Sequence, residues 1–170
     1  ILATAPLDQT AIDILSPYGE IITAPDDRED TLVSLAADAE VIVVRGVAQI
    51  TETVIEAADK LKVIGRTGVG INNIDIACAT ARGIPVVFTP GANSRAVAEA
   101  AMAFLLALAK RVTYWDSQTK ANKWNSRYHS MNDDLEGTTL GIVGFGNIGQ
   151  QLARLATPFD MKIIACDPYT

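Results

Sequence analysis

Short runs of β-branched and other apolar residues alternate along this chain with longer segments in which apolar residues recur every three or four positions. The short runs predict strands, and the longer segments predict helices. Strands are expected at residues 1–5, 21–23, 41–44, 62–65, 86–89, 139–143 and 162–165, and helices at residues 7–15, 27–37, 51–58, 74–81, 95–110 and 148–155. Because helices rather than hairpin turns separate the strands, we expect an α/β protein whose parallel sheets are covered on both faces.

The alternation is interrupted between Thr113 and Gly137, where polar residues dominate and the periodicity is weak. We interpret this stretch as a crossing segment between two α/β units. The expected domains are residues 1–94 and residues 95–170, each a doubly wound parallel sheet, and the second is incomplete.

The helix from Ala96 to Lys110 is apolar on nearly every side. Glu99 is its main exception and is expected to pair with Arg95 one turn earlier. Ser94 is expected to cap the start of the helix through its hydroxyl group. A helix of this composition is predicted to be buried in a domain or subunit interface.

Charge and cysteine content narrow the classes of partner. The 170 residues include 14 Lys and Arg against 20 Asp and Glu, a formal charge of −6 without a basic cluster, so we expect no nucleic-acid or anionic membrane partner. The longest apolar run, from Ala100 to Ala109, is too short to cross a bilayer. Cys78 and Cys166 are too few for a disulfide framework or a metal cluster, and Cys166 is expected in a buried strand. These features predict a reduced, cytoplasmic protein without a bound metal.

The strongest local motif is a glycine-rich turn between an expected strand and an expected helix. Gly144 would permit the tight turn, Gly146 would let the backbone approach a pyrophosphate, and Gly149 would allow close helix packing. The next strand ends at Asp167, 18 residues after Gly149, where a carboxylate can accept hydrogen bonds from ribose hydroxyls. No Arg follows Asp167, which favours NAD over NADP. The alternative is a glycine-rich turn in a fold that binds no dinucleotide.

A second candidate site lies at the expected carboxyl ends of the first strands. The loop from Gly68 to Gly70 exposes successive backbone N–H groups, and Arg45 and Arg66 are expected nearby. In open α/β sheets ligands bind at this edge, so the pattern predicts a small anionic substrate. Ordinary turn glycines beside solvated arginines are the alternative. The single histidine, His129, is expected on a surface or at an interface rather than in catalysis.

Several longer motifs carry a family resemblance from about Val41 to Thr170. They are Val43-Val-Arg45, Lys62-Val-Ile-Gly-Arg-Thr-Gly-Val-Gly70, Asn73-Ile-Asp75, Arg82-Gly-Ile-Pro-Val86, Asn93-Ser-Arg-Ala-Val-Ala-Glu99 and the segment from Gly141 to Gly149. With these motifs the chain resembles the D-isomer-specific 2-hydroxyacid dehydrogenases, and among them most closely those that act on phosphoglycerate, in serine biosynthesis. Residues 1–40 match only in their strand and helix pattern.

The resemblance implies a flavodoxin-like substrate domain followed by a Rossmann-like NAD domain, with the active site in the cleft between them. It implies that the substrate is held by Arg45, Gly68, Val69, Gly70 and Asn93, with Arg45 on the phosphate of 3-phosphoglycerate. It implies NAD binding by Val69, Gly144, Gly146, Asn147, Ile148, Gly149 and Asp167. It also implies a homodimer formed through the helix from Ala96 to Lys110.

The chain departs from the family pattern in two ways. Asn72 stands where the family often has Asp, a change that we expect to be tolerated because Asp75 is kept. The family's catalytic Arg, Glu and His belong to later segments, so no residue of this chain is assigned a catalytic role, and the chain is interpreted as the first half of a longer enzyme. Two alternatives remain open: a non-enzymatic NAD(H)-sensing protein of the corepressor type, and an inactive fragment of the dehydrogenase.

Overall fold

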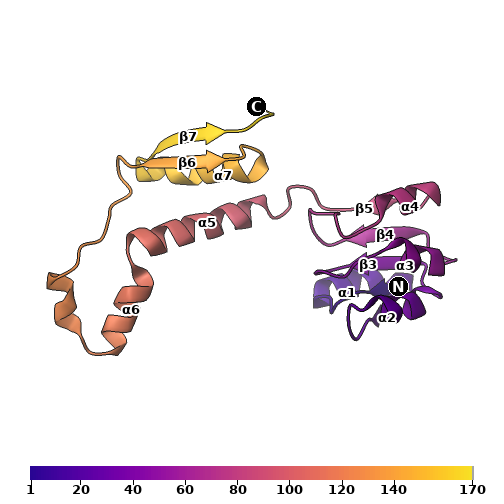
Figure 1. Ribbon diagram of the computed structural model, residues 1–170. Helices are drawn as coiled ribbons and strands as arrows, with labels where there is room; N and C mark the ends of the chain where they lie inside the picture. Colours follow the sequence, from indigo (N-terminus) through magenta and orange to yellow (C-terminus); the bar gives the residue numbers. More distant parts are fainter. Residues whose placement is uncertain (170) are drawn as a thin grey trace. The chain divides into compact units, whose positions relative to one another are not determined.

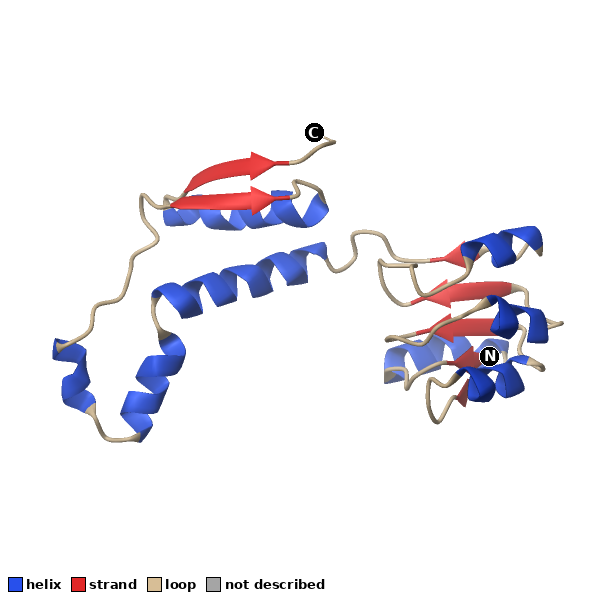
Figure 2. Cartoon of the chain, viewed as in Figure 1, coloured by secondary structure: helices blue, strands red, loops and turns tan. Residues whose placement is uncertain are grey.

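The computed structural model describes residues 1–169, which form two compact units, one from Ile1 to Ala92 and the other from Asn93 onward. Each unit combines parallel strands with helices (Figures 1 and 2). Among the described residues, no helix is both long and apolar enough to cross a membrane.

The first unit contains a five-stranded sheet in the order β2-β1-β3-β4-β5, with every neighbouring pair parallel. Its elements are β1 Leu2–Ala3, α1 Gln9–Leu15, β2 Ile22–Thr23, α2 Glu29–Ala36, β3 Val41–Val44, α3 Glu52–Ala57, β4 Val63–Arg66, α4 Ile76–Ala81 and β5 Val86–Val87, with the 3-10 turn Ser16–Tyr18 after α1. This strand order is that of the flavodoxin-like doubly wound fold, so the expected fold class is confirmed.

The helices of this unit are short, and side-chain caps and packing hold them. Asp8, Thr51 and Asp75 accept hydrogen bonds from backbone N–H groups at the starts of α1, α3 and α4. Helices of six to eight residues are marginal alone, so burial against the sheet must stabilise them. The core consists of alternating strand residues packed against helix residues, among them Ile42, Val44, Ile64, Leu32, Val54 and Ile55.

The second unit contains a two-stranded parallel sheet, with β6 Thr139–Val143 paired in register with β7 Lys162–Cys166. Helix α7, Asn147–Ala156, covers one face of this pair and packs against α5, Ser94–Ala109 (Figure 2). On the strands, Val143 is 95% exposed and Ile164 is 63% exposed. Apolar side chains of this two-stranded sheet are therefore uncovered among the described residues.

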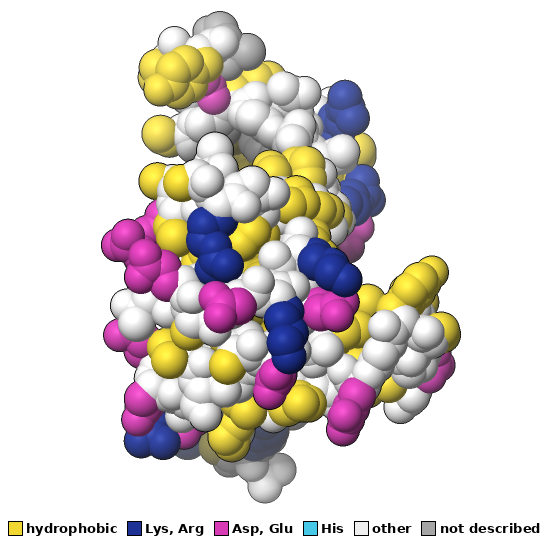
Figure 3. Space-filling model, turned by 90° about the vertical axis from the view of Figure 1, so that its right-hand side faces the viewer, with side chains coloured by type: hydrophobic (Ala, Val, Ile, Leu, Met, Phe, Trp, Pro, Cys, Tyr) yellow, Lys and Arg dark blue, Asp and Glu magenta, His cyan; other side chains and the backbone are white. Residues whose placement is uncertain are grey.

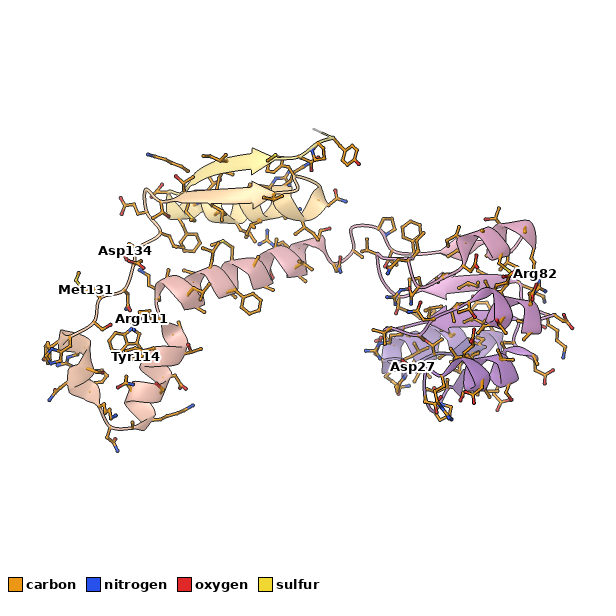
Figure 4. All side chains as sticks on the ribbon, viewed as in Figure 1. Asp27, Arg82, Arg111, Tyr114, Met131 and Asp134 are labelled. Carbon is orange, nitrogen blue, oxygen red and sulfur yellow. The ribbon has the colours of Figure 1, made fainter. Side chains whose placement is uncertain are left out.

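The segment between Thr113 and Gly137 is more regular than its composition predicts. It contains helix α6, Val112–Lys120, and the 3-10 turn Trp124–Tyr128, and Arg111 turns the chain from α5 into α6 with a φ of 48°. The Arg111 guanidinium lies 4.3 Å from the Tyr114 ring centroid (Figure 4), and Lys120 pairs with Asp116 one turn away. Because α6 buries no residue, it lacks the apolar stripe by which helices are found in a sequence.

Two further expectations were wrong. Ser94 is the first residue of α5 rather than its cap, and neither it nor Asn93 makes a capping bond there. Cys166 is exposed rather than buried, because β7 is an outer strand of a two-stranded sheet. The expected pair of Arg95 with Glu99 is confirmed at 2.6 Å.

Three basic side chains on the surface of the first unit, Arg28, Lys60 and Lys62, form ion pairs. Basic side chains lie beside acidic ones on the face shown in Figure 3. In the first unit, Lys60 binds Asp38 at 2.6 Å and Lys62 binds Glu40 at 2.7 Å.

Candidate functional site

The glycine-rich turn of the second unit has a conformation that requires glycine at its first position. Gly144 follows β6 with a φ of 92°, in the left-handed region that side chains rarely adopt, and its N–H donates to the Cys166 carbonyl at 2.8 Å. Gly146 precedes α7 as its N-cap, and a Cβ built on it meets no atom within 4 Å. Backbone therefore stays accessible at Gly146, as the approach of a pyrophosphate requires.

Gly149 sets how closely α7 packs on the turn. A Cβ at this position would lie 2.2 Å from the Gly144 carbonyl oxygen and 3.2 Å from Cγ2 of Ile142. The close packing expected from the sequence is therefore present.

The start of α7 presents unused donors. The first N–H groups of a helix have no partner inside the helix, and no side chain caps this one. Asn147, Ile148 and Gly149 occupy these positions at the positive end of a ten-residue helix. This arrangement suits a phosphate or pyrophosphate group.

Asp167 lies at the end of β7, directly beside the turn. Its Oδ2 accepts the Phe145 N–H at 2.6 Å, and its Oδ1 accepts the Tyr169 N–H at 2.8 Å. A carboxylate offers about four acceptor positions on its two oxygens, which is the chemistry that ribose hydroxyls require as donors. The residues of the turn, the helix start and Asp167 thus fit a dinucleotide: backbone donors for its phosphates and an acidic acceptor for its ribose.

The loop from Gly68 to Gly70 follows β4 in the first unit. The Gly68 carbonyl accepts the Thr89 N–H at 3.1 Å and the Thr89 hydroxyl at 3.2 Å, which fixes the loop against the chain after β5. The Gly68 N–H is occupied by the Arg66 carbonyl at 2.9 Å. Within residues 1–169, the N–H groups of Val69 and Gly70 take part in none of the hydrogen bonds, so two neighbouring donors remain for a carboxylate.

Arg66 braces this loop, a role that its sequence position did not reveal. Its guanidinium donates to the carbonyls of Gly70 at 3.0 Å, Val44 at 3.2 Å and Gly46 at 3.1 Å. Three of the five guanidinium N–H donors are therefore engaged by backbone oxygens. Through these bonds Arg66 joins the loop after β4 to the end of β3 and the loop that follows it.

Arg45 lies at the end of β3, where the chain order of the sheet reverses. The Thr4 hydroxyl donates to the Arg45 carbonyl at 3.0 Å and accepts the Arg45 N–H at 2.9 Å, while the guanidinium donates to the Pro6 carbonyl. A cavity of about 310 Å³ opens here, at the topological switch point where doubly wound folds bind ligands. It is lined by Thr4, Ala5, Pro6, Ala24, Pro25, Asp26, Asp27, Arg45, Gly46, Val47 and Ala48.

The remaining candidates are more dispersed. Asn93 begins the second unit without a capping bond, and His129 is exposed after the 3-10 turn. The described residues hold no group of three His, Cys, Asp or Glu side chains that could bind a metal.

A second cavity, of about 320 Å³, was missed from the sequence. It lies between α6 and the following turn and is lined by Trp115, Gln118, Thr119, Lys123, Trp124, Ser126, Arg127, Ser130 and Asn132. Trp115 donates to Asn132 at 2.6 Å, and the Arg127 guanidinium lies 4.6 Å from the Trp124 ring. Trp124 and Arg127 are three residues apart, and this spacing was the one feature of the sequence that could have indicated the cavity.

Comparison with known proteins gives a consistent result. Residues 1–165 match the family model described as D-isomer specific 2-hydroxyacid dehydrogenase, catalytic domain. Over 169 residues the chain is 44% identical to a D-3-phosphoglycerate dehydrogenase of Methanocaldococcus jannaschii, covering 99% of this chain and 32% of that protein. It is 41% identical to a hydroxypyruvate reductase of Thermotoga maritima, covering 96% of this chain and 53% of that protein.

A solved structure shares the fold. The NAD-dependent formate dehydrogenase of Staphylococcus aureus, determined with NAD, superposes with a TM-score of 0.81 and 30% identity over 98% of this chain and 56% of that one. The chain thus spans roughly a third to just over half of the length of these proteins.

Proposed function

This chain belongs to the D-isomer-specific 2-hydroxyacid dehydrogenase family, and we propose that it is part of an enzyme that transfers a hydride between a D-2-hydroxy acid and NAD. The observation that carries the proposal is the glycine-rich turn, whose shape requires Gly144 and Gly149 and which leaves backbone donors beside the Asp167 carboxylate. The formate dehydrogenase that shares the fold was determined with NAD, which supports this choice of cofactor.

Residues of both units have roles in this proposal, the first as the substrate domain and the second as the start of the NAD domain. The pyrophosphate would be held by Gly144, Gly146, Asn147, Ile148 and Gly149. Asp167 would bind the adenosine ribose, and Val69 would lie near the nicotinamide. Bound NAD would supply the hydride acceptor, so that the hydroxy acid becomes a keto acid as its hydroxyl proton passes to a base. We assign that base, and the groups that polarise the carbonyl, to the parent protein outside these residues.

The proposed substrate is 3-phosphoglycerate. The free N–H groups of Val69 and Gly70 suit its carboxylate, Asn93 would contact it, and Arg45 would bind its phosphate. The phosphoglycerate dehydrogenase relative supports this choice, while the hydroxypyruvate reductase relative indicates the main alternative substrate, hydroxypyruvate. The two substrates differ in whether a second anionic group must be bound, and binding that group is the role given to Arg45.

The proposed assembly is a cytoplasmic homodimer formed through α5. The side of this helix away from Ala98 and Met102 carries Phe104, 70% exposed, and Leu108, 78% exposed. Large apolar side chains at this exposure, four residues apart on one helix face, are typical of a surface that a partner covers.

Turnover tests the proposal in the full-length protein. With NAD present, 3-phosphoglycerate should produce NADH at 340 nm with a higher kcat/KM than glycerate or lactate. Binding of NADH without turnover of any D-2-hydroxy acid would instead support a dinucleotide-sensing protein, and the absence of both would refute the proposal.

A further inference from the structure

The backbone at Phe145, between the first two glycines of the turn, is held by two side chains from different elements. Its N–H donates to Asp167 at 2.6 Å, and its carbonyl accepts from Nε2 of Gln150 at 3.0 Å. Gln150 lies in the first turn of α7, and the proposed cofactor site gives it no role.

The bond from Gln150 fixes the direction of a neighbouring donor. The Phe145 carbonyl and the Gly146 N–H belong to one planar trans peptide, so they point in opposite directions. With the carbonyl held toward Gln150, the Gly146 N–H is held on the opposite side, and no hydrogen bond within residues 1–169 uses it. Gly146 has no side chain to restrain this peptide, so without Gln150 the peptide could rotate and present its oxygen there instead.

We propose that Gln150 is a positioning residue for the cofactor pyrophosphate: its amide holds the Phe145 carbonyl so that the Gly146 N–H remains available as a donor. The Asp167 bond restrains the preceding peptide in the same way. The turn therefore already has its binding conformation before the dinucleotide arrives. This lowers the conformational entropy that must be lost on binding. This inference rests on the proposed function, because it requires that the turn binds a dinucleotide.

The test compares Gln150→Met with Gln151→Met in the full-length protein. Both changes replace an amide by a thioether of similar length in the same helix, but the Gln151 side chain makes none of the described hydrogen bonds. Loss of one hydrogen bond should raise the Kd of NADH and of ADP by about three- to tenfold in Gln150→Met. The Kd of adenosine, which lacks a pyrophosphate, should not change, and Gln151→Met should match wild type for all three ligands.

Amide hydrogen exchange gives a second readout that does not depend on affinity. Without cofactor, a peptide covering residues 144–147 should exchange faster in Gln150→Met than in wild type, and saturating NADH should remove the difference. Should Gln150→Met fail to fold, as judged by circular dichroism, Gln150→Ala decides by the same measurements.

Two results would overturn the inference while leaving NAD binding intact. One is a Gln150→Met protein with wild-type affinity and exchange, and the other is an equal loss of affinity for adenosine and ADP. If wild-type protein binds no NADH at all, the proposed function fails first, so the two failures are distinguishable.

Discussion

Replacing Gly149 by Ala should disturb the nucleotide unit more than any other single added methyl group in its turn. The new Cβ would begin 2.2 Å from the Gly144 carbonyl oxygen, and real Cβ atoms essentially never approach closer than 3.0 Å. The contacted atom is backbone in a turn already set by a φ of 92°, so it cannot rotate away as a flexible side chain would. Helix α7 must therefore move away from β6.

The expected cost follows from this forced displacement. Adding a methylene to a well-packed contact costs about 1–3 kcal/mol, and backbone on one side places this contact at the upper end of that range. A displaced α7 also misplaces the N–H groups that would bind the pyrophosphate. Losing one hydrogen bond to a charged group costs about 1.5–3 kcal/mol, so the Kd of NADH should rise by roughly 10- to 100-fold.

The assays are urea unfolding and NADH titration of the full-length protein, with Gly141→Ala as the control. Gly141 lies in β6, and two strand residues separate it from Gly144, where the turn begins. A Cβ at Gly141 meets no atom within 4 Å. Gly149→Ala should lower the unfolding midpoint and weaken NADH binding, while Gly141→Ala should do neither. If the two variants behave alike, the reasoning from the 2.2 Å contact is refuted.

Three further changes test other parts of the account. Arg66→Met should raise the KM for 3-phosphoglycerate more than the Kd of NADH, because it releases the three carbonyls that fix the substrate loop; equal effects on both would contradict this. Phe104→Asp should convert the dimer to monomers in analytical ultracentrifugation, and a persistent dimer would exclude α5 as the interface. The hydrogen bond from Lys60 lowers the pKa of the Asp38 carboxyl, so Lys60→Met should raise that pKa toward its ordinary value in an NMR titration. This pair contributes stability above the unfolded-state pKa of Asp38 and loses it as the pH falls through the lowered pKa, so wild type and Lys60→Met should converge in acid.

The sequence predicted best those features that depend on local pattern. The strands at residues 41–44 and 139–143 have the expected bounds. Each run rich in β-branched residues is followed at once by a turn that contains glycine. The glycine motif also specified geometry: the turn at Gly144 and the close packing at Gly149 are both present. Each of these features follows from the chemistry of a few neighbouring residues.

Features that depend on distant partners were missed. Periodicity did not find α6, since this helix is accompanied by a cation–π contact of Arg111 with Tyr114 and by the Lys120–Asp116 ion pair rather than by an apolar stripe. The role of Arg66 depends on Val44 and Gly46, which lie about 20 residues away in the chain and meet it only when β3 pairs with β4. The exposure of Cys166 likewise depends on which strands pair beside β7, and no local pattern encodes that.

The most direct test of the central claim is calorimetric titration of NADH and NADPH into the full-length protein and its Asp167→Ala variant. The account predicts saturable NADH binding by wild type, weaker binding of NADPH because its 2′-phosphate would meet the Asp167 carboxylate, and a reduced difference between the two cofactors in the variant. Wild-type protein that binds neither cofactor, or an Asp167→Ala variant with unchanged affinity for both, would contradict it.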